Sequence, residues 1–197
     1  MTAITDPIAR FTALLDEARA IDPAILPEPT AFSLATVDEG GRPSLRIILL
    51  KSVDASGFVF YTNHESRKGR ELLATQRAAL CFHWQPLEIQ VRIEGPATPV
   101  TAAEADEYFA SRPRGSQIGA WASTQSRTLA RRADLEERVK RYEREFEGKA
   151  VARPGHWSGF RVAPERIEFW KGVPSRLHQR EVYQRDGERW RTELLYP

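Results

Sequence analysis

The sequence predicts a mainly β (α+β) fold, an antiparallel β-barrel with a few helices packed around it. Two observations carry this prediction: many short aliphatic and aromatic segments are separated by local turns, and only a few stretches show helical spacing. The length of 197 residues, with 41% hydrophobic and 28% charged residues, suits one domain with a substantial core. We therefore expect a single domain over residues 1–197.

A first helix is expected over about 7–20. Asp6 is a suitable N-cap, and Pro7 suits the first turn because its fixed φ angle is already helical. Apolar residues then recur at helical spacing, at Ile8, Phe11, Leu15 and Ala18. This spacing gives the helix one apolar face.

Strands dominate from Ala31 onward, where turn residues break up short apolar segments. We expect strands near 31–37, 44–52, 57–63, 78–84, 87–95, 157–163 and 166–172, and a final hairpin that turns at Asp186-Gly187. Ile89, Val91 and Ile93 alternate with polar residues, which is the period of a sheet with one buried face. The only cysteine, Cys81, lies in an apolar run and is expected to be a buried small hydrophobe.

Two further helices are expected in the second half of the chain. Thr101 and Glu104 have the spacing of a capping box, which predicts a helix that Pro113 should stop. A long helix is expected over about 127–147. Its apolar face is marked by Leu135, Val139, Tyr142 and Phe146.

Composition and motifs exclude several functional classes. The longest apolar run, 78–82, is far short of the ~20 residues that cross a bilayer, and the first thirty residues lack a targeting pattern, so we expect no membrane span and a cytoplasmic protein. A net charge of +2 argues against a nucleic-acid partner. The sequence has no dinucleotide fingerprint, phosphate loop, zincin motif or hydrolase elbow. A single cysteine and four scattered histidines predict no metal site.

A first basic cluster begins at Ser66, which precedes Arg67 and Lys68 at the start of a short predicted helix. A helix N-terminus offers free N–H groups, and two cations beside it make a good anion site. The alternative is an ordinary serine cap followed by exposed basic residues.

A second cluster combines Tyr108 and Arg112, which share a helix face, with Ser116 just past the proline. Two hydroxyls and a guanidinium suit a phosphate group. The alternative is a plain surface helix, because this spacing is common.

A third cluster contains Arg176, His178 and Arg180, which alternate and so lie on one side of an extended segment. Such a face could hold an anionic cofactor and present a titratable imidazole to a substrate, with Trp170 as a flat apolar wall. The alternative is a charged edge strand beside a core tryptophan.

A series of short motifs runs through nearly the whole chain, from about residue 7 to 197. In order they are Arg46-Ile-Ile-Leu-Leu-Lys51, Phe60-Tyr-Thr-Asn63, Ser66-Arg-Lys68, Ser111-Arg-Pro-Arg114, Ser116-Gln-Ile-Gly-Ala-Trp121, Gln125-Ser126, Ile167-Glu-Phe-Trp170 and Arg176-Leu-His178. Each motif is weak alone, but the ordered set is specific. The sequence resembles the pyridoxamine 5'-phosphate oxidase family, the flavin enzymes that make pyridoxal 5'-phosphate.

The resemblance implies a split antiparallel β-barrel that forms a homodimer, with two FMN sites at the interface and the C-terminal region in dimerisation. Family flavin contacts fall on Arg46, Ile47, Leu49, Lys51, Tyr61, Thr62, Arg67, Lys68 and Gln90 and, from the partner subunit, on Gln125, Ser126, Trp170 and Arg180. The substrate phosphate is expected at Lys51, Tyr108, Arg112 and Ser116. Arg176 and His178 are expected to face the pyridine ring as catalytic residues.

The implied reaction oxidises pyridoxamine or pyridoxine 5'-phosphate by hydride transfer to FMN, which O2 then reoxidises to give H2O2. Two departures from the family pattern are Ile89, where Arg is usual, and Gln179, where Asp is usual. Two alternatives stay open. The same fold could oxidise another substrate such as a phenazine precursor, or it could bind FMN or pyridoxal phosphate without catalysis.

Overall fold

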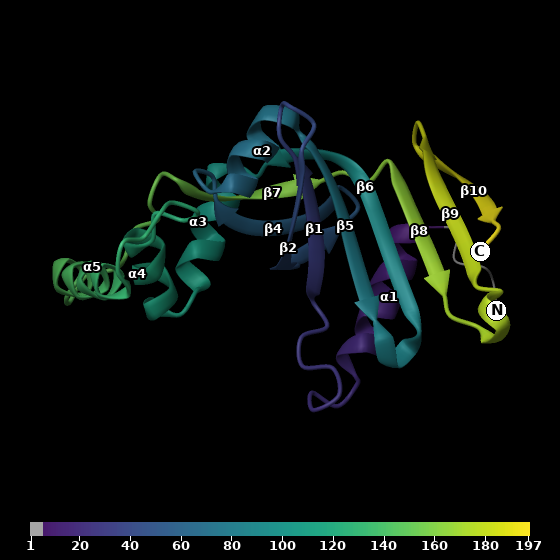
Figure 1. Ribbon diagram of the computed structural model, residues 1–197, viewed down its shortest axis with the longest axis horizontal. Coiled ribbons are helices and arrows are strands. Elements are labelled where there is room, and N and C mark those ends of the chain that lie inside the picture. The colour runs from purple at the N-terminus through teal and green to yellow at the C-terminus, as the bar shows by residue number, and fades with distance from the viewer. Residues whose placement is uncertain (1–5) are drawn as a thin grey trace.

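The computed structural model describes residues 6–197 and confirms the predicted mainly β (α+β) architecture. The strands are β1 (Ala31–Val37), β2 (Pro43–Leu49), β3 (Ser52–Asp54), β4 (Gly57–Asn63), β5 (Arg77–Trp84), β6 (Ile89–Pro99), β7 (Trp157–Val162), β8 (Arg166–Lys171), β9 (Gln179–Asp186) and β10 (Arg189–Leu195). The helices are α1 (Pro7–Arg19), α2 (Arg67–Thr75), α3 (Ala102–Ser111), α4 (Arg114–Ala122) and α5 (Arg132–Glu145). The strands form one antiparallel sheet with a main order β10-β9-β8-β6-β5-β1-β2 (Figure 1).

The long strand β6 joins two parts of this sheet. Its residues 89–94 pair with β8, whereas residues 97–99 pair with β7, which in turn pairs with β4. At Gly95, between these two stretches, an added Cβ would lie 2.0 Å from the carbonyl oxygen of Ala163. Only glycine allows this close approach, so the chain can curl here and the sheet becomes a half-barrel.

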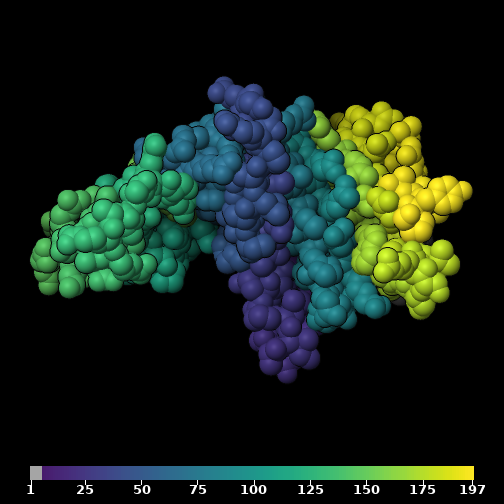
Figure 2. All heavy atoms as spheres, in the orientation of Figure 1, coloured from purple at the N-terminus to yellow at the C-terminus, as the bar shows by residue number. Residues whose placement is uncertain are grey.

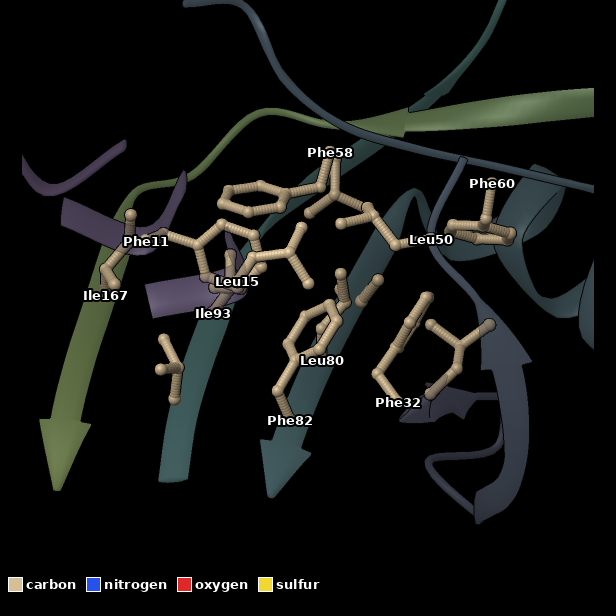
Figure 3. Packing of buried hydrophobic residues seen from close by; sticks show 14 of the residues in the cluster. Phe11, Leu15, Phe32, Leu50, Phe58, Phe60, Leu80, Phe82, Ile93 and Ile167 are labelled. Atoms are coloured by element: carbon tan, nitrogen blue, oxygen red, sulfur yellow. The ribbon is translucent and has the colours of Figure 1, made fainter. Parts of the chain in front are cut away.

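The main core lies between α1 and the concave side of the sheet (Figure 3). Phe11 is fully buried and packs edge-on against Phe58 and Phe82, with ring centroids 4.9 Å apart in both cases. Asp6 caps the helix, as predicted, by accepting a hydrogen bond from the Ile8 amide. Each large apolar side chain buried in this way contributes roughly 1.5 to 3 kcal/mol, so α1 is fixed to the barrel by its apolar face.

Helices α3, α4 and α5 form a separate lobe at one end of the barrel (Figures 1 and 2). Val139, Tyr142 and Phe146 pack this lobe onto a second cluster that includes Trp121 of α4 and the buried Trp157 of β7. At the opposite end of the molecule, β8, β9 and β10 extend the sheet (Figure 1). The two ends are therefore separated by the barrel.

Most predicted elements are confirmed, including the capping box at Thr101 and the hairpin at 186–187. The helix opened at Thr101 ends before Pro113, as expected, but one helix was not predicted and two predicted elements have other bounds. The chain starts a new helix, α4, directly after Pro113, because proline ends one helix but suits the start of the next. The long helix begins only at Arg132, and the expected strand 44–52 is split into β2 and β3.

Cys81 is half-buried instead of buried. It lies on β5, where buried and more exposed residues alternate, and its side chain is on the outer face of the sheet. In the described part of the chain, no helix has the length and apolar character needed to cross a membrane.

Candidate functional site

A cavity of about 780 Å³ lies between the barrel and the helical lobe. Its walls come from β2 and the residues after it, from β4, from the start of α2, from α3 and α4, and from β7. The lining residues are Ile47, Ile48, Leu49, Lys51, Tyr61, Thr62, Asn63, Lys68, Tyr108, Ser111, Arg112, Pro113, Ser116, Gly119, Ala120, Ser123, Gln125 and Trp157. They include three cations and no carboxylate, so the cavity is suited to an anionic ligand.

The start of α2 brings Lys68 to the cavity. The Ser66 side chain caps the helix by accepting from the Gly69 amide, and a Cβ at Gly69 would lie 2.4 Å from the His64 carbonyl oxygen. This close contact seats the helix against the end of β4. Lys68 Nζ then lies 2.9 Å from Gln125 Oε1 and 3.2 Å from Thr62 Oγ1. Burial, with help from nearby Arg46, lowers the pKa of Lys68 to about 8.

Aromatic rings and a guanidinium form the other end of the cavity. Tyr61 stacks on Tyr108 with centroids 4.1 Å apart, and on Trp157 at 5.5 Å. The Arg112 guanidinium lies 4.6 Å from the Trp157 ring. Its Nη1 atom is buried without a hydrogen-bond partner, and burial lowers the pKa of Arg112. An unpaired buried cation donor is costly, so this position favours a ligand that accepts hydrogen bonds and carries negative charge.

These features fit a flavin mononucleotide and a second phosphate ester. The volume is within the range of small-molecule and cofactor sites, ~300 to 1,000 Å³. The flat apolar walls suit a planar ring, while Lys68 beside Gln125 and Arg112 beside Trp157 offer cationic donors.

Two predicted flavin contacts, Arg46 and Arg67, do not line this cavity. Both pair with Glu71 of α2: Arg67 Nε is 2.8 Å from Oε1, and Arg46 Nη2 is 3.4 Å from Oε2. Burial alone would raise the pKa of Glu71, but hydrogen bonds from two hydroxyls and a guanidinium lower it to about 2. The carboxylate is therefore ionised, and it holds the two arginines near the start of α2.

A second hollow of about 560 Å³ lies at the opposite end of the sheet, beside β8 and β9. It contains Trp170, His178 and Arg180, with the Trp170 and His178 rings 4.6 Å apart. The buried Glu168 carboxylate accepts from Arg180 Nε at 2.8 Å and fixes its orientation. Ile89, one of the two departures from the family pattern, also lines this hollow, as does Gln179.

Arg176 lies outside both hollows and is exposed. It ends the short 3-10 turn Pro174–Arg176, and it and Ser175 have φ angles of 60° and 61°. Non-glycine residues rarely adopt this left-handed conformation, although Gln76 and Glu88 also adopt it where a helix and a 3-10 turn end. The expectation that Arg176 lies with His178 and Arg180 on one side of an extended segment was therefore wrong.

The structure thus places some of the predicted site residues in the cavity and others outside it. The cavity gathers Ile47, Leu49, Lys51, Tyr61, Thr62, Lys68, Tyr108, Arg112, Ser116 and Gln125. Outside it are Arg46, Arg67, Gln90, Ser126, Trp170, Arg176, His178 and Arg180. Gln125 was expected to come from the partner subunit, but it lies in the cavity of its own chain, because α4 and the residues after it fold back onto Lys68.

Sequence reasoning missed several residues of the site. Trp157 forms a wall of the cavity, but only the pairing of β7 with β4 brings it next to Tyr61. Glu71 and Glu168 were missed as well. Each is a carboxylate within a cation-rich stretch, and only the structure shows that they are buried and paired with arginines.

Comparison with protein families matches almost the whole chain. Residues 21–171 match the family described as pyridoxamine 5'-phosphate oxidase, and residues 157–197 match the pyridoxine 5'-phosphate oxidase C-terminal dimerisation region. A pyridoxine/pyridoxamine 5'-phosphate oxidase of Myxococcus xanthus (strain DK1622) is 59% identical over 98% of this chain and 92% of its own length. A protein of the same name from Anaeromyxobacter dehalogenans (strain 2CP-C) is 55% identical over 100% of this chain and 98% of its own.

Solved structures share the fold. PhzG from Burkholderia lata 383, in complex with tetrahydrophenazine-1-carboxylic acid, has a TM-score of 0.89 at 35% identity and covers 100% of this chain and 95% of that one. A pyridoxamine 5'-phosphate oxidase-related, FMN binding protein of Nostoc punctiforme has a TM-score of 0.74 at 16% identity, covering 96% of both chains, which shows the fold alone. The motifs, the half-barrel and these matches agree: the chain belongs to the pyridoxamine 5'-phosphate oxidase family of oxidoreductases.

Proposed function

We propose that the protein uses FMN to oxidise pyridoxine 5'-phosphate and pyridoxamine 5'-phosphate to pyridoxal 5'-phosphate, with O2 reduced to H2O2. The alcohol loses two hydrogens. The amine loses two hydrogens and then takes up water and releases ammonia, so that atoms and electrons balance in both cases. When bound, FMN supplies the acceptor for the hydride that leaves the substrate C4' carbon.

The observation that carries this proposal is the cavity with three cations and no carboxylate, in which a buried Arg112 donor lacks a partner. Two phosphate esters, cofactor and substrate, would satisfy these groups. Arg112 binds the substrate phosphate, with Lys51, Tyr108 and Ser116 around it. Anchoring the substrate by this remote group orients its reacting carbon, a contribution worth up to ~7 to 11 kcal/mol in well-aligned systems.

The residues that would hold FMN surround the start of α2 and the adjoining strands. Lys68 and the arginines near it would bind its phosphate, and residues of β2 and Tyr61 would contact its ring. The full set is Arg46, Ile47, Leu49, Lys51, Tyr61, Thr62, Arg67, Lys68, Gln90, Gln125 and Ser126, with Trp170 and Arg180 from the partner subunit.

The proposed enzyme is a homodimer formed from one domain over residues 1–197. The match of residues 157–197 to a dimerisation region supports this, and those residues form most of the lining of the second hollow. In the dimer, Arg176 and His178 of the partner subunit face the pyridine ring at the cavity. Arg176 would stabilise charge that develops in the transition state, and His178 would exchange a proton with the substrate. The cytoplasmic location and the absence of a nucleic-acid partner stay predictions from the sequence.

A second candidate function is oxidation of a phenazine precursor. The similarity to PhzG, whose structure contains a tetrahydrophenazine carboxylic acid, favours it. The set of Tyr108, Arg112 and Ser116 favours the B6 substrates, because two hydroxyls and a guanidinium suit the three oxygens of a phosphate group.

The test is to load the protein with FMN, remove oxygen, add pyridoxine 5'-phosphate and follow the visible absorbance of the flavin. We expect bleaching that reverses when air is admitted, with formation of H2O2. Persistence of the colour with both B6 phosphates would contradict the proposal. If tetrahydrophenazine-1-carboxylic acid bleached the flavin instead, the second candidate would be correct. Bound flavin that none of these compounds bleaches would indicate a binding protein.

A further inference from the structure

Glu71 is a buried carboxylate that connects two arginines of the proposed flavin site. Its side chain is 6% exposed, and its two oxygens have different partners. Oε1 accepts from Arg67 Nε at 2.8 Å, and Oε2 accepts from the hydroxyls of Thr36 and Ser44 at 2.5 and 2.6 Å. Arg46 Nη2 lies 3.4 Å from Oε2. Within residues 6–197, Glu71 is the one acidic residue paired with both arginines.

The two arginines are fixed in different ways. Arg46 donates from Nη1 to the Leu34 carbonyl and the Thr36 hydroxyl and from Nη2 to the Ser44 hydroxyl, and its side chain is 19% exposed. It is therefore locked in place. Arg67 has a partner in the described chain only at Nε, and its side chain is 56% exposed. Its two outer nitrogens stay open to a ligand.

Lys68 adds a third cation to this cluster, next to Arg46. Three like charges repel one another, and Glu71 is the counter-charge that allows them to gather at the start of α2. The cluster keeps an excess of positive charge. That excess suits a phosphate monoester, which carries about −1.5 to −2 charges at neutral pH.

We propose that Glu71 is a positioning residue for the phosphate group of FMN: it fixes Arg46 and Arg67 around the start of α2, so that the cationic cluster is assembled before the ligand arrives. Glu71 acts through the arginines and does not touch the phosphate. Such preorganisation strengthens binding because the ordering cost is met during folding. The inference rests on the proposed function, since it takes FMN as the ligand.

The test compares two ligands that differ only in the phosphate. The dissociation constants of FMN and riboflavin are measured by quenching of flavin fluorescence, for the wild-type protein and for Glu71→Gln, at a temperature where both are folded. We expect Glu71→Gln to weaken FMN binding about tenfold, the value of a hydrogen bond to a charged group, with riboflavin binding unchanged. A merely structural role would weaken both ligands equally.

Glu104→Gln is the matched control. Glu104 also has a pKa lowered to about 2 and an arginine partner, Arg161, but it lies on α3. Its variant should keep the wild-type ratio of the two affinities. Ser44→Ala removes one hydrogen bond to Glu71 and one from Arg46 and keeps every charge, so it also loosens the cluster if Glu71→Gln does not fold. We expect a smaller fall in FMN affinity, again with no change for riboflavin.

The outcomes separate this inference from the proposed function. If wild-type protein binds FMN and is bleached by substrate, but Glu71→Gln and Ser44→Ala both keep the wild-type ratio of affinities, Glu71 has no positioning role. If wild-type protein does not bind FMN, the proposed function fails and the inference fails with it.

Discussion

The cavity and the hollow beside β8 and β9 hold their functional groups in two different ways. In the cavity, the stacked aromatic rings and the half-buried Lys68 and Arg112 all come from one chain and lie around one space. At the other end Arg176 is exposed, and Leu194 and Leu177 are 81% and 69% exposed. This difference is expected if two copies of the chain share each site, so that the cavity of one copy meets the exposed, open end of the other. In the proposed dimer each end would complete the other, and the variants below test the two ends.

The largest effect is expected from Arg176→Ala at the open end. Loss of a group that stabilises charge in the transition state typically costs ~10² to 10³ in rate, while the cavity and its FMN contacts stay intact. Stopped-flow bleaching by pyridoxine 5'-phosphate measures flavin reduction, and fluorescence quenching measures FMN affinity. Arg185→Ala, an exposed arginine on β9, is the control and should be neutral. A normal rate of bleaching in Arg176→Ala would contradict the assignment.

The next effect is expected from Arg112→Met in the cavity. The substrate phosphate loses a buried cationic donor, so KM for pyridoxine 5'-phosphate should rise roughly 10- to 100-fold. The melting temperature should change little, because the variant also removes a buried unpaired donor. Arg114→Met is the matched control, since Arg114 bonds to the carbonyls of Phe146 and Lys149 outside the cavity. An unchanged KM in Arg112→Met would place the phosphate elsewhere.

Lys68 sets an expected pH dependence at the cavity end. Its lowered pKa of about 8 means that the free protein loses this charge as the pH rises through 8. FMN affinity should therefore fall up to about tenfold between pH 7 and pH 9. Titration by fluorescence quenching checks this, and Lys68→Met should remove the dependence. A profile with the same slope in both proteins would show that another group is responsible.

The last effect concerns the stability of the fold in acid and not binding or activity. The pKa of Glu71 is about 2 in the folded protein, below its unfolded value near 4.5, so its stabilising contribution is complete above about pH 4.5 and is lost as the pH falls toward 2. The contribution is about 3 kcal/mol at most. Urea unfolding at pH 6 and pH 3 measures it. Glu71→Gln should lose less stability over this interval than wild type, and an equal loss in both would contradict the coupling.

The elements of the fold that the sequence predicts are those that follow from local patterns. β1, α1 and the capping box at Thr101 follow from alternation, helical spacing and capping chemistry, which act over a few residues. The start of α4 was missed because Pro113 both ends one helix and begins another. The site was predicted from motifs, but its assembly was not. Trp157 meets Tyr61 only through strand pairing, and no local pattern identifies Glu71 as the shared partner of two arginines.

The central claim is that each site combines the cavity of one chain with the open end of its partner. Arg112→Met and Arg176→Ala place one defect at each end, and co-expression with two different tags allows the mixed dimer to be purified. Each homodimer carries the defect in both sites, whereas a mixed dimer gathers both defects in one site and leaves the other intact.

Activity at low pyridoxine 5'-phosphate concentration is the deciding measurement. We predict that the purified mixed dimer recovers about half of wild-type activity, because one of its two symmetric sites is restored. A mixed dimer no more active than the average of the two mutant homodimers would show that the cavity and the open end of one chain form the site together, and would contradict the account.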